Sequence, residues 1–156
     1  MTPAGAALSV TVSRIFDAPR ERVFAALTEA DQIHQWFGGG LSTVTAARVD
    51  ARPGGDYRIE VRRRDGGDST LTGAYREVVP PARLVYSWVW DGVDETLVTI
   101  ELREIPGLTR RTALHLTHAR IPHADYAEFH ERGWSHGLGQ VAALVERGAN
   151  KETEEP

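Results

Sequence analysis

The chain has 156 residues, of which 41% are hydrophobic and 26% are charged, and these proportions are typical of a single soluble globular domain. Its 18 basic and 22 acidic residues exclude the strongly basic composition with which proteins bind nucleic acid or an anionic membrane surface. The lack of cysteine excludes disulfides, thiol catalysis and cysteine metal sites. The sequence shows neither a signal peptide nor an apolar run near the ~20 residues of a membrane span, so we expect a cytoplasmic protein.

The N-terminal part of the chain predicts a strand followed by two short helices. Residues 8–13 alternate between apolar and polar types, as in a half-buried strand. In residues 17–27, a proline suited to a first helical turn precedes apolar residues at helical spacing. Thr28 and Asp31 resemble a capping box, which would begin a second helix that ends at the glycines at 38–40.

The middle of the chain predicts a series of further strands. Its turns are rich in Gly, Pro and Asp, and connections this short make neighbouring strands antiparallel. Apolar and aromatic residues alternate with Arg, Glu and Thr, so one face of the sheet should be packed and the other exposed to water. Gly73, inside one strand, indicates a bend. The expected strands cover residues 41–50, 55–64, 69–79, 83–91, 95–104 and 109–118.

The last part of the chain predicts one long helix over residues 121–147, with Pro122 in its first turn and Trp134 at the middle of its apolar face. A helix of about 25 residues is about 37 Å long, and in a chain of this size only a wide, curved sheet offers a partner surface of that length. Gly133 should let the helix backbone approach that surface closely. The acidic tail, residues 150–156, should be disordered.

These elements together predict an α+β fold of the helix-grip type, in one domain that covers residues 1–149. A seven-stranded curved antiparallel sheet would wrap around the long C-terminal helix, with two short helices after the first strand. Such a fold leaves a hollow between helix and sheet that can hold a small molecule. Its exposed sheet edges would also allow a homodimer.

Several segments, taken in order, carry a resemblance to a known family. They are FDAPRERVFAALT (16–28) with Trp36 and Phe37, RPGGDYR (52–58), GAYREVVPPARLVYSW (73–88), LTH (116–118) and HERGW (130–134). They resemble START-like proteins of the SRPBCC superfamily, and most closely the branch grouped with activators of the heat-shock-protein-90 ATPase. The resemblance runs from about Leu8 to Val145 and implies the same helix-grip fold. Because the superfamily includes lipid carriers, hormone receptors, polyketide cyclases and co-chaperone domains, it leaves the function open.

Aromatic residues are the candidates for the wall of the hollow. Each buried aromatic side chain removes about 150–250 Å² from water, whether it fills the core or lines a pocket, and in this fold both regions lie beneath the long helix. The residues expected in the wall are Trp36, Phe37, Tyr57, Tyr75, Trp88, Trp134 and Leu138.

Two titratable residues are candidates for acid–base catalysis: His130, one helical turn before Trp134, and Glu77, on the fourth strand. The alternative for His130 is a structural histidine, hydrogen-bonded at the edge of the helix. The histidines show no HExxH pattern, so we expect no metal. Neither Ser87 nor Ser135 stands in a nucleophile-elbow motif, which argues against a Ser–His–Asp triad. We also expect no cofactor. The arginine run 62–64 predicts a solvated hairpin end, with attraction of an anionic ligand as its alternative.

Three functions are therefore compatible with the sequence. The first, which we favour over catalysis, is the binding of a small hydrophobic or amphipathic molecule, such as a lipid, in the hollow. The second is a role as an interaction module that contacts a chaperone, as in a stress response. The third is an enzyme of the cyclase or hydrolase type that uses the same hollow.

Overall fold

The computed structural model of the chain describes residues 7–38 and 42–154, and the side chains of all of these except 109 and 148–154. The order of its elements is a strand, two short helices, six strands and a long helix, as the sequence predicts. Along the chain they are β1 (Leu8–Phe16), α1 (Arg20–Thr28), α2 (Ala30–Trp36), β2 (Ser42–Val49), β3 (Asp56–Arg63), β4 (Asp68–Val79), β5 (Arg83–Trp90), β6 (Val93–Ile105), β7 (Leu108–Ile121) and α3 (Ala124–Glu154).

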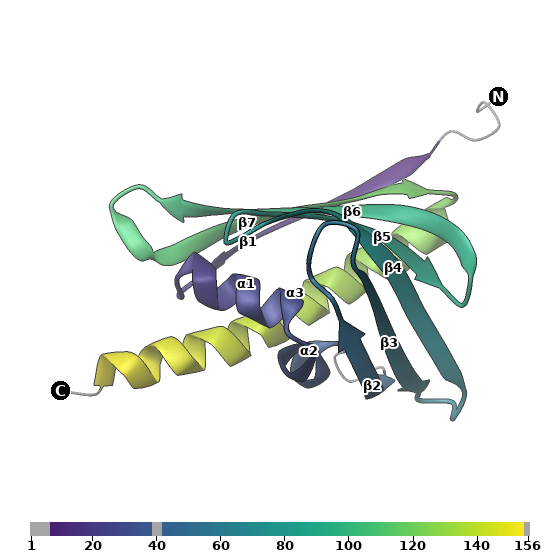
Figure 1. Ribbon diagram of the computed structural model, residues 1–156, viewed down its shortest axis with the longest axis horizontal. Coiled ribbons are helices and arrows are strands. Elements are labelled where there is room, and N and C mark those ends of the chain that lie inside the picture. Colours follow the sequence, from purple (N-terminus) through teal and green to yellow (C-terminus); the bar gives the residue numbers. More distant parts are fainter. Residues whose placement is uncertain (1–6, 39–41, 155–156) are drawn as a thin grey trace.

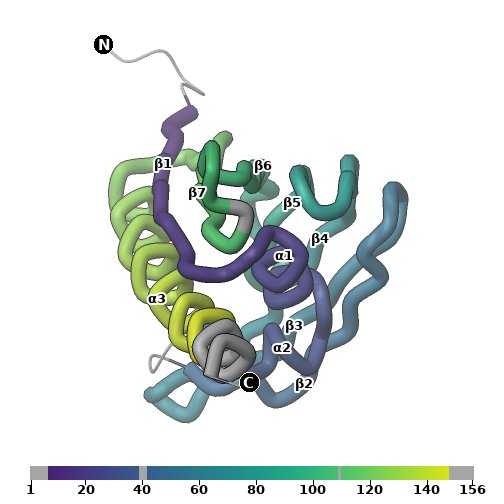
Figure 2. Tube along the Cα trace, turned by 90° about the vertical axis from the view of Figure 1, so that its left-hand side faces the viewer, coloured from purple at the N-terminus to yellow at the C-terminus, as the bar shows by residue number. Residues whose placement is uncertain are grey.

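The described strands form one antiparallel sheet in the order β1, β7, β6, β5, β4, β3, β2. Strands β2 to β7 are neighbours in sequence order because their connections are short, whereas β1 pairs with the distant β7. The sheet is strongly curved, and all three helices lie on its concave side, with α3 along β1 and with α1 and α2 beside it (Figures 1 and 2). The predicted helix-grip fold is therefore confirmed.

The boundaries of the long helix differ from the prediction. β7 continues to Ile121, which is fully buried and remains paired with β1. Pro122 therefore lies in the connection, and α3 begins at Ala124, because strand pairing and burial at this point prevail over the helical spacing of the sequence. At its other end α3 continues through residues 150–154, which the sequence predicts to be disordered; the rest of that tail, 155–156, lies outside the described residues.

The start of α2 also differs from the prediction. The capping box does not form, because the Thr28 hydroxyl donates instead to the Phe24 carbonyl oxygen of α1 at 2.8 Å. No side chain caps the first turn of α2. This helix ends at Trp36, and two glycines of the run that should terminate it, residues 39–40, lie outside the described residues.

Gly73 permits a close crossing of side chain and backbone in the middle of the sheet. It pairs with Tyr57 of β3, and a Cβ atom built here would lie 2.0 Å from the Ser87 carbonyl oxygen and 2.6 Å from the Tyr57 ring. Because glycine leaves this space free, the Tyr57 hydroxyl reaches across β4 and donates to that Ser87 oxygen at 2.7 Å. The Ala74 amide donates to the Ser87 hydroxyl at 2.8 Å. The absence of a side chain at Gly73 thus permits a hydrogen bond from Tyr57 of β3 to β5.

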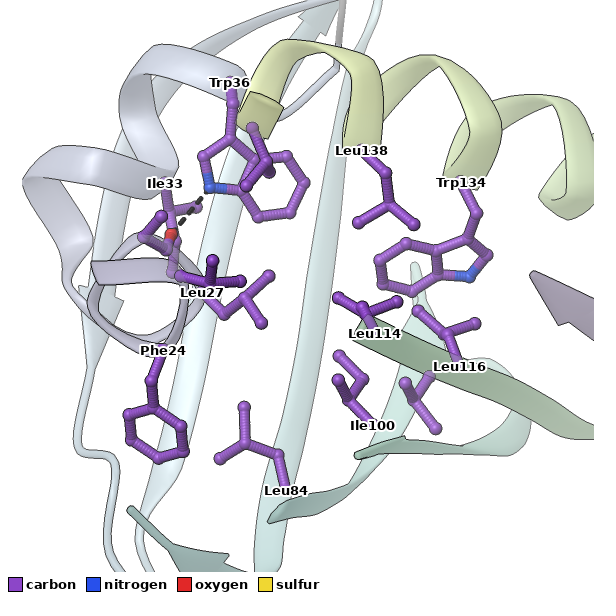
Figure 3. Close-up of a cluster of buried hydrophobic side chains, with 14 of the residues drawn as sticks. Phe24, Leu27, Ile33, Trp36, Leu84, Ile100, Leu114, Leu116, Trp134 and Leu138 are labelled. Atoms are coloured by element: carbon purple, nitrogen blue, oxygen red, sulfur yellow. Dashed lines mark hydrogen bonds between the residues drawn. The ribbon is translucent and has the colours of Figure 1, made fainter. Parts of the chain in front are cut away.

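The hydrophobic core lies between α3 and the sheet and continues beneath α1 and α2 (Figure 3). Trp134 and Leu138 of α3 point down toward the sheet residue Leu114, which is almost fully buried. Trp36 donates its indole N–H to the Ala26 carbonyl oxygen at 2.7 Å and so fixes α2 against α1. Burial of each leucine side chain contributes about 1.5–3 kcal/mol relative to exposure, so this contact between α3 and the sheet is a main source of stability.

Candidate functional site

A cavity of about 370 Å³ lies between the first half of α3, the end of α2 and the ends of β3, β4 and β5. Four of the residues that the sequence places in the wall do line it, namely Trp36, Phe37, Trp88 and Trp134. The wall residues that the sequence reasoning did not place there are Gly38, Ser42, Val61, Arg63, Ser69, Trp90, Asp91, Tyr126, Phe129, Gly133, His136 and Gly137, and the catalytic candidate His130 lines the cavity as well.

The other three predicted wall residues lie in the core, away from the cavity. Tyr57 and Tyr75 pack with Tyr86 in a cluster of three rings whose centroids are 5.5–5.6 Å apart. Burial raises the pKa of each of these tyrosines, so they stay protonated. Leu138 is fully buried among the leucines of the sheet, and the neighbouring Gly137 lines the cavity in its place.

The missed wall residues follow the same periodicities that identify the elements. On β3 the packed positions Tyr57, Ile59 and Val61 alternate, and the next residue in that alternation is Arg63. On α3 the wall residues recur every three or four positions, from Tyr126 onward. Both periods could have been extended from the sequence, but where the cavity begins along them depends on how closely α3 approaches the sheet.

Gly133 borders open space rather than a close packing contact. No atom lies within 4 Å of a Cβ atom built at this position, although the sequence suggests a close approach of the helix here. The close approach is made at Gly137, where a Cβ atom would lie 3.4 Å from the Trp36 ring. The space beside Gly133 is part of the cavity.

His130 of α3 is bonded through both ring nitrogens. The Trp88 indole N–H donates to His130 Nε2 at 3.0 Å, which makes that nitrogen an acceptor. The proton of the neutral ring is therefore on Nδ1, which donates to the Tyr126 carbonyl oxygen at 2.9 Å. The arrangement leaves His130 without a lone pair for removing a proton from a substrate, and it matches the structural alternative for this residue.

His118 of β7 has the opposite tautomer and holds a second indole of the wall. The Trp134 indole N–H donates to His118 Nδ1 at 3.0 Å, so the ring proton is on Nε2 and is donated to the Thr96 hydroxyl at 2.7 Å. The Thr96 hydroxyl in turn donates to the Trp88 carbonyl oxygen at 2.9 Å. These bonds join β5, β6, β7 and α3 behind the cavity.

The two histidines are kept neutral by their surroundings. The exposed fractions of His118 and His130 are 0% and 3%, and their ring centroids are 4.5 Å apart. Burial, and then the neighbouring His130, lower the pKa of His118 to about 3. Burial also lowers the pKa of His130. A charge on either ring would be desolvated and would displace an indole donor.

Glu77 lies outside the cavity, on the exposed part of β4. Its carboxylate pairs with Arg83 at 3.3 Å, and about half of its side chain is exposed to solvent. The structure therefore does not bring the two catalytic candidates, His130 and Glu77, to one site. An exposed ion pair of this kind contributes little to stability.

The comparisons with known proteins agree with this architecture. A family model described as activator of Hsp90 ATPase homolog 1-like protein matches residues 17–146. Protein CV1439 from Chromobacterium violaceum is similar at 29% identity, with a TM-score of 0.81 over 88% of this chain and 97% of that chain. CalU16 from Micromonospora echinospora is similar at 26% identity, with a TM-score of 0.70 over 96% of this chain and 83% of that chain. The search of curated proteins found no match.

A further solved structure shows likeness of fold alone. It is the AHSA1 protein from Silicibacter pomeroyi, with 22% identity and a TM-score of 0.78 over 90% of this chain and 99% of that chain. Within the described residues, no helix is both long and apolar enough to cross a membrane. Because the family model spans most of the sequence and the fold is the START-like helix grip, this chain belongs to the family of activator of Hsp90 ATPase homolog 1-like proteins.

Proposed function

We propose that this protein binds a small apolar or amphipathic molecule in the cavity between α3 and the sheet. The observation that carries the proposal is the wall itself, because all four tryptophans of the chain line one cavity of about 370 Å³. Sites for small molecules have volumes of about 300–1,000 Å³ and mainly apolar, aromatic walls. A guest would bind by leaving water for this aromatic surface.

Three of the four indoles in the wall are held by hydrogen bonds, which supports binding over simple filling of a loose core. Trp36, Trp88 and Trp134 each donate the indole N–H to a buried acceptor, so their rings are held in place. Phe37 fills the space among them, with its ring centroid 5.6 Å from that of Trp36 and 6.0 Å from that of Trp88. A guest would therefore lose little free energy to ordering these side chains.

The test is to fill the cavity without harming the fold. Gly133→Leu adds a side chain where a Cβ atom meets no other atom within 4 Å, and this position is in the wall. Gly139→Leu is the matched control, because it is on the same helix, has equally open space and is not a wall residue. Both changes replace glycine in a helix and should stabilise it by about 1 kcal/mol.

Isothermal titration calorimetry with naphthylmethanol, a flat neutral probe, then decides the matter. We expect wild type and Gly139→Leu to bind it and Gly133→Leu to lose binding, while both variants keep or raise the melting temperature. Equal binding by the two variants, or no binding by the wild type, would contradict the proposal.

Contact with a chaperone is the second candidate function, and membership of the activator family favours it. It predicts that the protein raises the ATPase rate of a purified Hsp90. Because such docking would use the outer surface, Gly133→Leu should raise the rate as much as wild type does. An unchanged ATPase rate would count against this second candidate.

A further inference from the structure

Three polar side chains form a row along the sheet side of the cavity wall. Ser42 of β2 pairs directly with Arg63 of β3, and Arg63 Nη1 donates to the hydroxyl oxygen of Ser69 on β4. All three residues line the cavity. The opposite wall, on α3, is largely aromatic, and its polar side chains are those of Tyr126, His130 and His136.

Arg63 keeps donor capacity for a guest. Its Nη1 also donates to the Asp68 carbonyl oxygen at 3.1 Å, and its Nε donates to Asp65 at 3.3 Å. Its Nη2 packs against Gly67 of the hairpin turn and has no hydrogen-bond partner among the described residues. The pair with Asp65 is half-exposed on both sides, so water and salt screen it and it neutralises the guanidinium only weakly.

Two further wall donors lack acceptors among the described residues. Ser69 is buried, and its hydroxyl accepts from Arg63 while its own proton is donated to no described group. The indole N–H of Trp90 is buried and has no hydrogen-bond partner in the described part of the chain. Because an unpaired buried donor is unfavourable, a guest that brings acceptor atoms would be preferred over one that brings donors.

The acidic residue of the wall, Asp91, follows β5 and is bonded to Thr70 of β4, the residue next to Ser69. Its carboxylate accepts from the Thr70 amide at 2.8 Å in the turn after β5. Its charge, together with that of Asp94, acts on Tyr126 of α3 and adds to the burial that raises the pKa of that tyrosine. A negative group on a guest would be repelled by Asp91 and attracted to Arg63, so its favourable position is at the Arg63 end of the row.

We infer that the guest is a small amphipathic acid, whose apolar body lies among the indoles and whose carboxylate accepts hydrogen bonds from Arg63 and Ser69. The inference rests on the proposed binding function and adds the chemical class of the ligand to it. Guanidinium is suited to this role because its planar set of donors matches a carboxylate.

The experiment compares probes that share one ring system and differ in the head group. Naphthoate, naphthylmethanol and naphthylmethylamine carry a negative, a neutral and a positive head, and their affinities are measured by calorimetry. We expect wild type to bind naphthoate about tenfold or more tightly than the alcohol, as a charge-assisted hydrogen bond allows. The amine should bind most weakly.

Two substitutions test whether Arg63 causes the preference. Arg63→Gln should lower the affinity for naphthoate much more than the affinity for naphthylmethanol, and so remove the preference for the acid. Arg62→Gln is the matched control, because it makes the same change of net charge on the same strand at an exposed residue that is absent from the wall. It should keep the preference. Ser69→Ala should reduce the preference in part, and melting temperatures show that each variant is folded.

The outcomes separate this inference from the proposed function. If naphthylmethanol binds as tightly as naphthoate, or if the preference for naphthoate persists in Arg63→Gln, the inference of an acidic ligand is contradicted, whereas the proposed binding function is not. If no probe of the series binds, both are contradicted. Octanoate distinguishes a fatty acid from an aromatic acid as the ligand. If octanoate binds more tightly than naphthoate, and its binding depends on Arg63 in the same way, the inference of an acidic ligand is supported and its apolar part is a fatty acyl chain.

Discussion

Trp88 of β5 donates its indole N–H to Nε2 of His130 on α3 at 3.0 Å, across the interface between the sheet and the long helix. The bond uses the single polar group of the indole and the single acceptor of the neutral imidazole. It orients a ring of the cavity wall and at the same time withdraws the histidine from acid–base chemistry. The same residue pair therefore determines the shape of the site and what the site can do.

If this hydrogen bond contributes to stability, the losses of stability caused by substituting Trp88 and by substituting His130 should not be additive. Trp88→Phe and His130→Leu should each lower the free energy of unfolding by about 1–3 kcal/mol, and the double variant should lose less than the sum. We expect a coupling energy of about 0.5–3 kcal/mol from urea unfolding. Trp90→Phe is the matched control, because the Trp90 indole N–H has no partner among the described residues. Additive losses for Trp88 and His130 would refute the assignment.

Stability should fall in acid because of the buried histidines. The pKa of His118 is lowered from 6.5 to about 3, and that of His130 is lowered as well. Below pH 6.5 the unfolded chain therefore binds more protons than the folded one, so stability is complete above that pH and declines as the pH falls toward 3. The slope should approach about 1.4 kcal/mol per pH unit for each histidine that stays neutral.

The variant His118→Gln isolates this contribution from that of the carboxylates. Glutamine can accept from Trp134 and donate to Thr96 without taking up a proton. Urea unfolding between pH 6.5 and about 3 should give a shallower decline for this variant than for wild type. The exposed His34 serves as control, and His34→Gln should leave the slope unchanged. Identical slopes for His118→Gln and wild type would remove the buried histidine as the cause.

Gly73 should tolerate no side chain. In Gly73→Ala the Cβ atom would collide with the Ser87 carbonyl oxygen and the Tyr57 ring, so β4 must shift away from β5. We expect a loss of about 1–3 kcal/mol or more, as for other overpacked sites. Gly139→Ala on α3, where a Cβ atom meets no other atom within 4 Å, should instead gain about 1 kcal/mol. A thermal melt of the two variants decides, and two shifts of the same sign would be inconsistent with the crossing at Gly73.

Leu138 and Phe129 should separate stability from binding. Leu138 is fully buried below α3 and away from the cavity, so Leu138→Ala should cost about 2–5 kcal/mol in unfolding free energy. Phe129 is 58% exposed and lines the cavity, so Phe129→Ala should change stability little and weaken binding of naphthylmethanol. Chemical unfolding and calorimetry on the same samples provide both readings. If Leu138→Ala instead weakened binding and Phe129→Ala instead lowered stability, the binding surface would lie beneath Leu138.

Most of the fold is predictable from residue spacing because periods of two and of three to four residues directly report which face of an element is buried. The sheet is predicted by the alternation of residues in β3 and β5, and its covering helix by the helical spacing around Trp134. The ends of elements were less accurate. At Ile121, pairing with β1 extends a strand into residues whose own spacing favours a helix, and such pairing over long sequence distances leaves no local signal.

The curved antiparallel sheet, the long helix on it and the aromatic interior all follow from local periodicity and short connections, so they can be predicted from the amino-acid sequence. Three features are visible only in the folded molecule: which aromatic residues face the cavity, which of them fill the core, and the role of His118 and His130 as acceptors for two indoles. Those outcomes depend on the height and rotation of α3 above the sheet. That placement is set by the sum of many side-chain contacts and not by any one stretch of the chain.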